Sequence, residues 1–155
     1  MFKHYIGVIG AGSCSQAVSD LAYSVGKKIA ESNSYLVCGG LGGVMQAAAR
    51  GAKDSGGITI GILPGRVRSD SNEFMDIVIP TGLGEARNTI VVNASDVIVA
   101  LPGEFGTLSE FAFALKVGKP VINLGRWDLE NAAIRADDAE EAVRLALQKI
   151  NHRIT

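Results

Sequence analysis

The sequence predicts an α/β fold in which a mainly parallel sheet of six to seven strands lies between two layers of helices. Short β-branched runs alternate along the chain with longer segments rich in Ala and Leu, and Gly or Pro follows each run. Some runs are continuously apolar, most clearly 97–101, as expected for strands covered on both faces. Together these patterns indicate a doubly wound, Rossmann-like three-layer sandwich, with residues 1–155 forming one domain.

The expected elements follow from where these patterns begin and end. Six strands are predicted, at 5–9, 35–38, 58–63, 76–79, 97–101 and 120–124. Five helices are predicted, at about 15–31, 44–55, 84–94, 107–117 and 138–150. The last helix has the clearest signals, because Asp137 or Asp138 can cap it and Glu140 and Glu141 fall in its first turn. Residues 64–75 are predicted to form a polar surface loop.

The composition excludes several classes of partner. Fifteen basic residues stand against 16 acidic ones, for a net charge of −1, and no basic run marks a nucleic-acid or membrane surface. Cys14 and Cys38 are too few for a disulfide framework or a zinc site, so no metal is expected. No signal peptide or apolar stretch of about 18 residues is present. These features predict a cytoplasmic protein.

Glycine-rich turns follow three of the predicted strands, at the sheet edge where such folds bind ligands. They read Gly10-Ala11-Gly12-Ser13, Gly39-Gly40-Leu41-Gly42-Gly43 and Pro102-Gly103-Glu104-Phe105-Gly106-Thr107. Glycine lets backbone N–H groups approach a phosphate, and each following helix offers unpaired N–H donors. Tight turning alone is the other explanation, but three such turns on one edge favour a phosphate site. The dinucleotide fingerprint is incomplete, because Ser15 occupies its third glycine position.

Several segments of the sequence together carry a family resemblance. Gly84-Glu85-Ala86-Arg87-Asn88, the strand 97–101, and Pro102-Gly103-Glu104-Phe105-Gly106-Thr107-Leu108-Ser109-Glu110 together resemble the signature of the Lonely Guy (LOG) family, once labelled putative lysine decarboxylases. Gly39-Gly40-Leu41-Gly42-Gly43-Val44-Met45 resembles the family's GGxxGxM motif. The resemblance extends from about residue 6 to residue 124. No lysine lies in a recognisable setting for pyridoxal phosphate, so a decarboxylase is not expected.

The resemblance implies hydrolysis of the N-glycosidic bond of a nucleoside 5′-monophosphate, with no cofactor. Arg87 and Glu110 would be the catalytic pair, since a carboxylate can stabilise a developing oxocarbenium ion and an arginine can hold phosphate or polarise the base. The turns and the two motifs would supply the phosphate- and nucleotide-binding residues. These are Gly10, Gly12, Ser13, Gly39, Gly40, Gly42, Gly43, Met45, Asn88, Pro102, Gly103, Gly106 and Thr107.

Departures from the family pattern favour a second function. Glu104 replaces the second glycine of the PGG motif, and Asn88 stands where other members carry Lys. Both features resemble a sister branch that includes molybdenum cofactor carrier proteins, which would bind a phosphorylated pterin without catalysis. Thr107 and Glu110 also fit a capping box, a purely structural alternative. An N-glycosidase and a carrier of a molybdopterin-type cofactor therefore both remain open.

Self-association is also expected. The predicted helix at 84–94 contains Ile90, Val91, Val92 and Ala94, more apolar surface than one sheet face needs to bury. Members of the family resemble dimers or tetramers, so the sequence predicts a homodimer or homotetramer whose small-molecule sites can lie near the interface.

Overall fold

A computed structural model describes residues 3–153 and contains a parallel sheet of seven strands. The strands, in chain order, are β1 (Tyr5–Ile9), β2 (Tyr35–Cys38), β3 (Ile58–Leu63), β4 (Ile77–Pro80), β5 (Val97–Ala100), β6 (Val121–Asn123) and β7 (Ile134–Arg135). Their spatial order is β4-β3-β2-β1-β5-β6-β7, and every neighbouring pair is parallel. The predicted Rossmann-like α/β class is confirmed.

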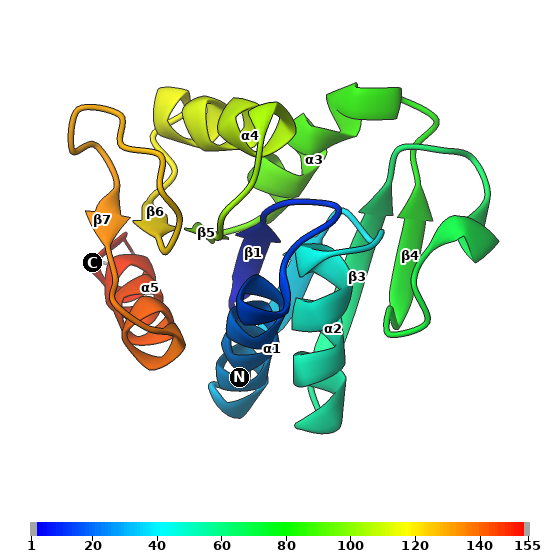
Figure 1. The fold of residues 1–155 in the computed structure, drawn as a ribbon, viewed down its shortest axis with the longest axis horizontal. Helices are drawn as coiled ribbons and strands as arrows, with labels where there is room; N and C mark the ends of the chain where they lie inside the picture. Colours follow the sequence, from blue (N-terminus) through cyan, green and yellow to red (C-terminus); the bar gives the residue numbers. More distant parts are fainter. Residues whose placement is uncertain (1–2, 154–155) are drawn as a thin grey trace.

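Helices cover both faces of this sheet (Figure 1). They are α1 (Gln16–Glu31), α2 (Val44–Asp54), α3 (Arg87–Ala94), α4 (Phe105–Lys116) and α5 (Ala139–Arg153), with 3-10 turns η1 (Arg68–Asp70) and η2 (Gly84–Ala86). The apolar cores separate accordingly. One cluster packs α1, α2 and α5 against the sheet, and the other packs α3 and α4 against the opposite face.

Helices α1 and α2 pack unusually closely, and glycine permits it. A Cβ atom on Gly26 would lie 1.8 Å from the carbonyl oxygen of Ala48, and one on Gly51 would lie 2.0 Å from that of Tyr23. Side chains at these two positions would force the helices apart. This close contact holds the first turns of α1 and α2 side by side at the edge of the sheet that carries the glycine-rich turns.

The strand order changes direction between β1 and β5. From β1 the chain builds outward through β2, β3 and β4, and it then returns through α3 to place β5 on the other side of β1. Ile9 at the end of β1 is paired with Ala100 at the end of β5. Because α1 and α4 leave this point toward opposite faces, their diverging turns leave a crevice, the usual ligand position in such sheets.

The differences from the predicted elements are local. Strand β7 was not among the six predicted strands, because two residues carry no readable pattern. Helix α4 begins at Phe105, two residues before the predicted start, and η2 occupies the first turn predicted for α3. The polar loop at 64–75 includes η1, and Asn72 fastens it to the second glycine-rich turn. The N–H of Asn72 donates to the Gly40 carbonyl at 2.9 Å, and its side-chain amide donates to the Leu41 carbonyl at 2.8 Å.

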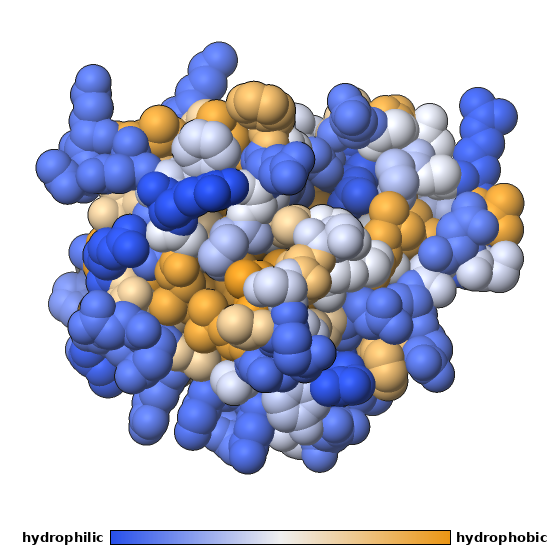
Figure 2. Space-filling view, viewed as in Figure 1, coloured by the Kyte–Doolittle hydropathy of each residue, from blue (hydrophilic) through white to orange (hydrophobic). Residues whose placement is uncertain are grey.

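The predicted self-association was based on apolar residues of α3, and the structure shows that these residues are largely buried. Val91 and Val92 are fully buried, and Ile90 packs against the core under α3 and α4, so that α3 has little apolar surface to spare. Exposed apolar side chains lie elsewhere, including Ile77 and Ile79 on the edge strand β4. Figure 2 shows one face of the molecule with a hydrophilic periphery and apolar side chains nearer its centre. In residues 3–153, no helix is long and apolar enough to cross a membrane.

Candidate functional site

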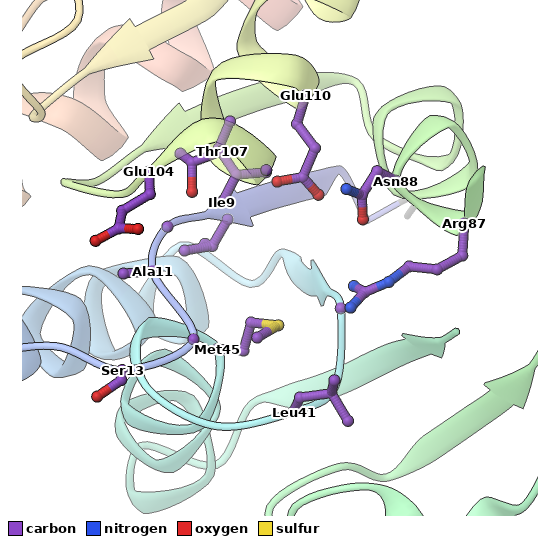
Figure 3. A pocket seen from close by; sticks show the side chains of 15 residues that line it. Ile9, Ala11, Ser13, Leu41, Met45, Arg87, Asn88, Glu104, Thr107 and Glu110 are labelled. Carbon is purple, nitrogen blue, oxygen red and sulfur yellow. The ribbon is translucent and has the colours of Figure 1, made fainter. Parts of the chain in front are cut away.

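A cavity of about 400 Å³ opens at the point where the strand order changes direction (Figure 3). The turn after β1, the turn after β2, the first residues of α3 and the first two turns of α4 form its walls. Ten of the residues predicted from the sequence line it. They are Gly10, Gly12, Ser13, Gly39, Met45, Arg87, Asn88, Gly106, Thr107 and Glu110. Four segments distant in sequence thus contribute to one site.

Five other predicted residues lie outside the wall of this cavity: Gly40, Gly42, Gly43, Pro102 and Gly103. Two of them act on the backbone instead. Gly43 has a φ of +61°, and a Cβ there would lie 2.3 Å from the carbonyl oxygen of Ala11. A Cβ on Gly103 would overlap the side chain of Thr107. These glycines therefore allow the turns to pack together, which is a supporting role.

In the turn after β1, some backbone amides donate hydrogen bonds within the protein and others do not. The N–H of Ala11 donates to the Pro102 carbonyl at 3.1 Å, which joins the turn after β1 to the turn after β5. Across residues 3–153, the amides of Gly12 and Ser13 have no hydrogen-bond partner. In the first turn of α4, helix geometry likewise leaves the N–H groups of Gly106 and Thr107 without a partner inside the helix.

Two glycines in the wall are not required by the packing of the protein. A Cβ atom on either Gly12 or Gly106 would meet nothing within 4 Å. A side chain at these positions would instead project into open space beside the unused amides. Because Gly12 and Gly106 have no side chains, a ligand can approach the unused backbone amides closely. Backbone N–H groups and helix N-termini carry partial positive charge, so the ligand that they favour is an anion.

Arg87 occupies the first position of α3 and reaches toward Gly39 across the cavity (Figure 3). Its side chain is only 9% exposed, yet its Nε has no hydrogen-bond partner. A Cβ on Gly39 would collide with the guanidinium, so glycine at this position makes room for the arginine. A buried unpaired N–H group costs free energy, and the positive end of a helix dipole opposes a cation. Both costs favour a ligand that completes the hydrogen bonding of Arg87.

Glu110 projects into the same cavity from the second turn of α4 (Figure 3). Burial raises the pKa of its carboxyl to about 7, and the positive charge of Arg87 opposes that rise. Burial also lowers the pKa of Arg87, with Glu110 acting in the other direction. The two side chains attract one another without forming one of the ion pairs found in residues 3–153. Near neutral pH, Glu110 can therefore either donate or accept a proton.

The capping-box interpretation of Thr107 and Glu110 is wrong. Helix α4 begins at Phe105 with Glu104 at its N-cap, and no side chain caps it. Thr107 therefore lies inside the helix, and Glu110 lies a further turn along it. Since neither residue caps α4, their positions in the cavity wall need another explanation.

Sequence reasoning missed part of the wall. Val8, Ile9, Ala11 and Leu41 line the cavity but are ordinary apolar residues. Val8 and Ile9 lie outside the motifs, and Ala11 and Leu41 occupy variable positions within them. Glu104 also lines it, and the sequence had marked this residue only as a departure from a family pattern. Trp127 supports the site from outside. Its indole Nε1 donates to the Gly103 carbonyl at 3.2 Å and so steadies the turn after β5.

Among residues 3–153, no group of three or more His, Cys, Asp or Glu side chains is placed to hold a metal ion.

The fold and the site define the class of protein: a Rossmann-like α/β protein with a glycine-lined, amide-rich cavity where its strand order changes direction. More narrowly, the chain belongs to the SLOG cluster4 family, whose model matches residues 3–153.

Three known proteins illustrate its similarities. The molybdenum cofactor binding protein of Rippkaea orientalis is 41% identical and has a TM-score of 0.90, covering 100% of this chain and 99% of that one. The molybdenum cofactor carrier protein of Chlamydomonas reinhardtii is 36% identical with a TM-score of 0.90, over 97% and 99% of the two chains. A cytokinin riboside 5′-monophosphate phosphoribohydrolase of Mycobacterium tuberculosis is 35% identical over 70% of this chain and 63% of that enzyme.

Proposed function

We propose that this protein binds and carries a phosphorylated pterin of the molybdenum cofactor type. One observation carries the proposal: Arg87, a buried arginine whose Nε lacks a hydrogen-bond partner, lines a cavity that also presents unused amides and no side chains at Gly12 and Gly106. The similarity to cofactor-binding proteins over almost the whole of both chains supports the same conclusion.

The residues of the cavity fit the chemistry of such a ligand. The unused amides of Gly12, Ser13, Gly106 and Thr107 would hold its phosphate, aided by the N-terminal ends of α1 and α4. At the other end, the Arg87 guanidinium donates hydrogen bonds, as would suit the carbonyl oxygen of a pterin. The Glu110 carboxyl can accept from ring N–H and amino groups when it is ionised.

The cavity also offers apolar contacts for the ring system of the ligand. Met45 and Leu41 line the cavity and supply apolar area for the flat face of a heterocycle (Figure 3). The phosphate and the ring system would therefore meet different walls, which fixes the direction in which the ligand enters.

Cofactor loading in a bacterial host that makes the molybdenum cofactor tests this proposal. The purified protein is oxidised with iodine, and the fluorescent pterin product is quantified per protein chain. We expect Arg87→Met to retain less than a tenth of the wild-type pterin. Arg144→Met is the matched control, since Arg144 is an exposed arginine on α5, and it should load normally. Absence of pterin from the wild type, or equal loading of Arg87→Met, would reject the proposal.

N-glycosidic hydrolysis is the second candidate, and the Arg87–Glu110 arrangement favours it. Water would add to C1′ of the ribose as the base departs with a proton, while the Glu110 carboxylate stabilises the positive charge on the sugar. Incubation with AMP, followed by chromatography for free adenine, tests this candidate. Release of adenine that Glu110→Gln abolishes would establish an enzyme, whereas no release would leave the carrier function.

The predicted homodimer or homotetramer now depends on a different surface. Ile77 and Ile79 are about half exposed on β4, which lies at the edge of the sheet. An unpaired strand edge with apolar side chains is suited to association with another copy. Light scattering should give a mass above that of one chain, and Ile77→Lys with Ile79→Lys should reduce it to the monomer value.

A further inference from the structure

A second cavity of about 460 Å³ adjoins the first and shares two residues with it, Gly12 and Ser13. It lies between the first turn of α1, the outer side of α2 and the segment before β4. The first cavity is by itself within the range of small-ligand sites, about 300–1,000 Å³. A ligand with one phosphate and one ring system therefore leaves the second cavity unexplained.

The junction between the two cavities suits a negatively charged link. The amides of Gly12 and Ser13 have no partner within residues 3–153, and the space where a Gly12 side chain would lie is open. Helix α1 starts beside them, with the Ser15 hydroxyl accepting from the N–H of Val18 at 3.3 Å. Arg87, which is buried and whose Nε has no hydrogen-bond partner, lines the first cavity on one side of this junction. Positive partial charge thus continues from the first cavity to the second.

The wall of the second cavity suits a planar heterocycle. Phe74 provides a half-buried aromatic face, while Arg50, Glu73 and Gln46 provide hydrogen-bonding groups. The side chains of Gln46 and Glu73 make no hydrogen bond or ion pair within residues 3–153. The Arg50 guanidinium lies 5.0 Å from the ring centre of Tyr23, which holds it in place and leaves its N–H groups unused. Arginine donates to carbonyl and ring nitrogen acceptors, and a carboxylate accepts from N–H and amino groups.

We propose that the two cavities form one elongated site for a pyrophosphate-linked ligand, with the pyrophosphate over Gly12 and Ser13 and one heterocycle in each cavity. This inference rests on the proposed function and narrows its ligand to a dinucleotide form. Guanine shares with pterin a 2-amino-4-oxo edge, which offers an acceptor to Arg50 and adjacent donors to Glu73. Two guanosines joined through a 5′,5′-pyrophosphate are therefore a suitable probe for both cavities.

Calorimetric titration with this diguanosine pyrophosphate and with GMP tests the inference. The wild type should bind the dinucleotide at least tenfold more tightly than GMP. Arg50→Ala should reduce the dinucleotide affinity at least fivefold, because the second cavity loses a contact. It should change the affinity for GMP less than twofold, because the first cavity, with Arg87 and Glu110, is intact and still binds this mononucleotide. Glu73→Gln should act in the same direction. Arg144→Ala, on α5, should change neither affinity, and thermal melting checks that each variant is folded.

Several results would overturn the inference: equal affinities for the two ligands, no binding of the dinucleotide, or equal losses for both ligands in Arg50→Ala. The proposed function would survive these results if pterin loading remained dependent on Arg87. If the wild-type protein carries no pterin but still binds the dinucleotide more tightly than GMP, the carrier function is rejected and the elongated site remains supported.

Discussion

The burial of Glu110 should make the stability of the protein depend on pH in a way that one substitution removes. A folded-state pKa of about 7 lies well above the ordinary glutamate value of 4.5, because burial penalises the ionised carboxylate. The folded protein therefore holds a proton between these two values that the unfolded chain has released. Stability contributed by protonated Glu110 is full below about pH 4.5 and is lost progressively up to about pH 7.

The magnitude follows from the size of the shift. Each pKa unit corresponds to about 1.4 kcal/mol, so ionisation of Glu110 should cost the folded state roughly 3 kcal/mol above pH 8. Glutamine has the shape of the protonated acid and cannot ionise. Glu110→Gln should therefore match the wild type near pH 5 and exceed it by about 2–3 kcal/mol at pH 8.5. In a domain of this size, that difference raises Tm by roughly 5–10 °C.

Urea unfolding and thermal melting at pH 5, 7 and 8.5 would measure this difference. Glu85→Gln is the matched control, because Glu85 is exposed in η2 and the substitution removes a carboxylate from outside the cavity. A difference between wild type and Glu110→Gln that does not change with pH would refute the reasoning. It would mean that the carboxylate is compensated in the folded state, by Arg87 or by water.

Three further predictions concern the packing and charge around the cavity. Gly12→Ala should change the free energy of unfolding by less than about 0.5 kcal/mol but weaken ligand binding, as measured by urea unfolding and by titration. Gly26→Ala should instead lower the free energy of unfolding by about 1–3 kcal/mol, because its Cβ would overlap the backbone of α2. Equal stabilities of the two variants would contradict this prediction. Glu104→Gln should tighten the binding of GMP about two- to fivefold at low salt, because the substitution removes a negative charge from the cavity wall. This gain in affinity should vanish at high salt. Weaker binding by the variant would show that Glu104 contacts the ligand favourably. Burial raises the pKa of the Cys38 thiol to about 11. Iodoacetamide at pH 8 should therefore modify only half-exposed Cys14 in the native protein and both thiols in denaturant, as counted by mass spectrometry. Rapid labelling of both thiols in the native protein would contradict the burial of Cys38.

Most of the fold could be predicted from local patterns in the sequence. A continuously apolar run such as 97–101 identifies a strand buried on both faces, and its alternation with helical segments requires a parallel sheet. The limits of that reasoning are equally local. Two-residue β7 has no pattern, and the start of α4 was misplaced because Thr107 resembled a cap while Glu104 occupied the cap position without a capping hydrogen bond.

The sequence by itself determined which backbone positions lack side chains, and so it predicted an anion site. The pair Arg87 and Glu110 was predicted from the resemblance of the sequence motifs to the LOG family. Only the tertiary structure decided how these parts are used. The order of strands joins three separate turns into one cavity, burial leaves the Arg87 Nε without a partner and raises the pKa of Glu110, and Gly12 and Ser13 connect that cavity to a second one. Burial, pairing and shared walls depend on residues far apart in the chain, so no local pattern could reveal them.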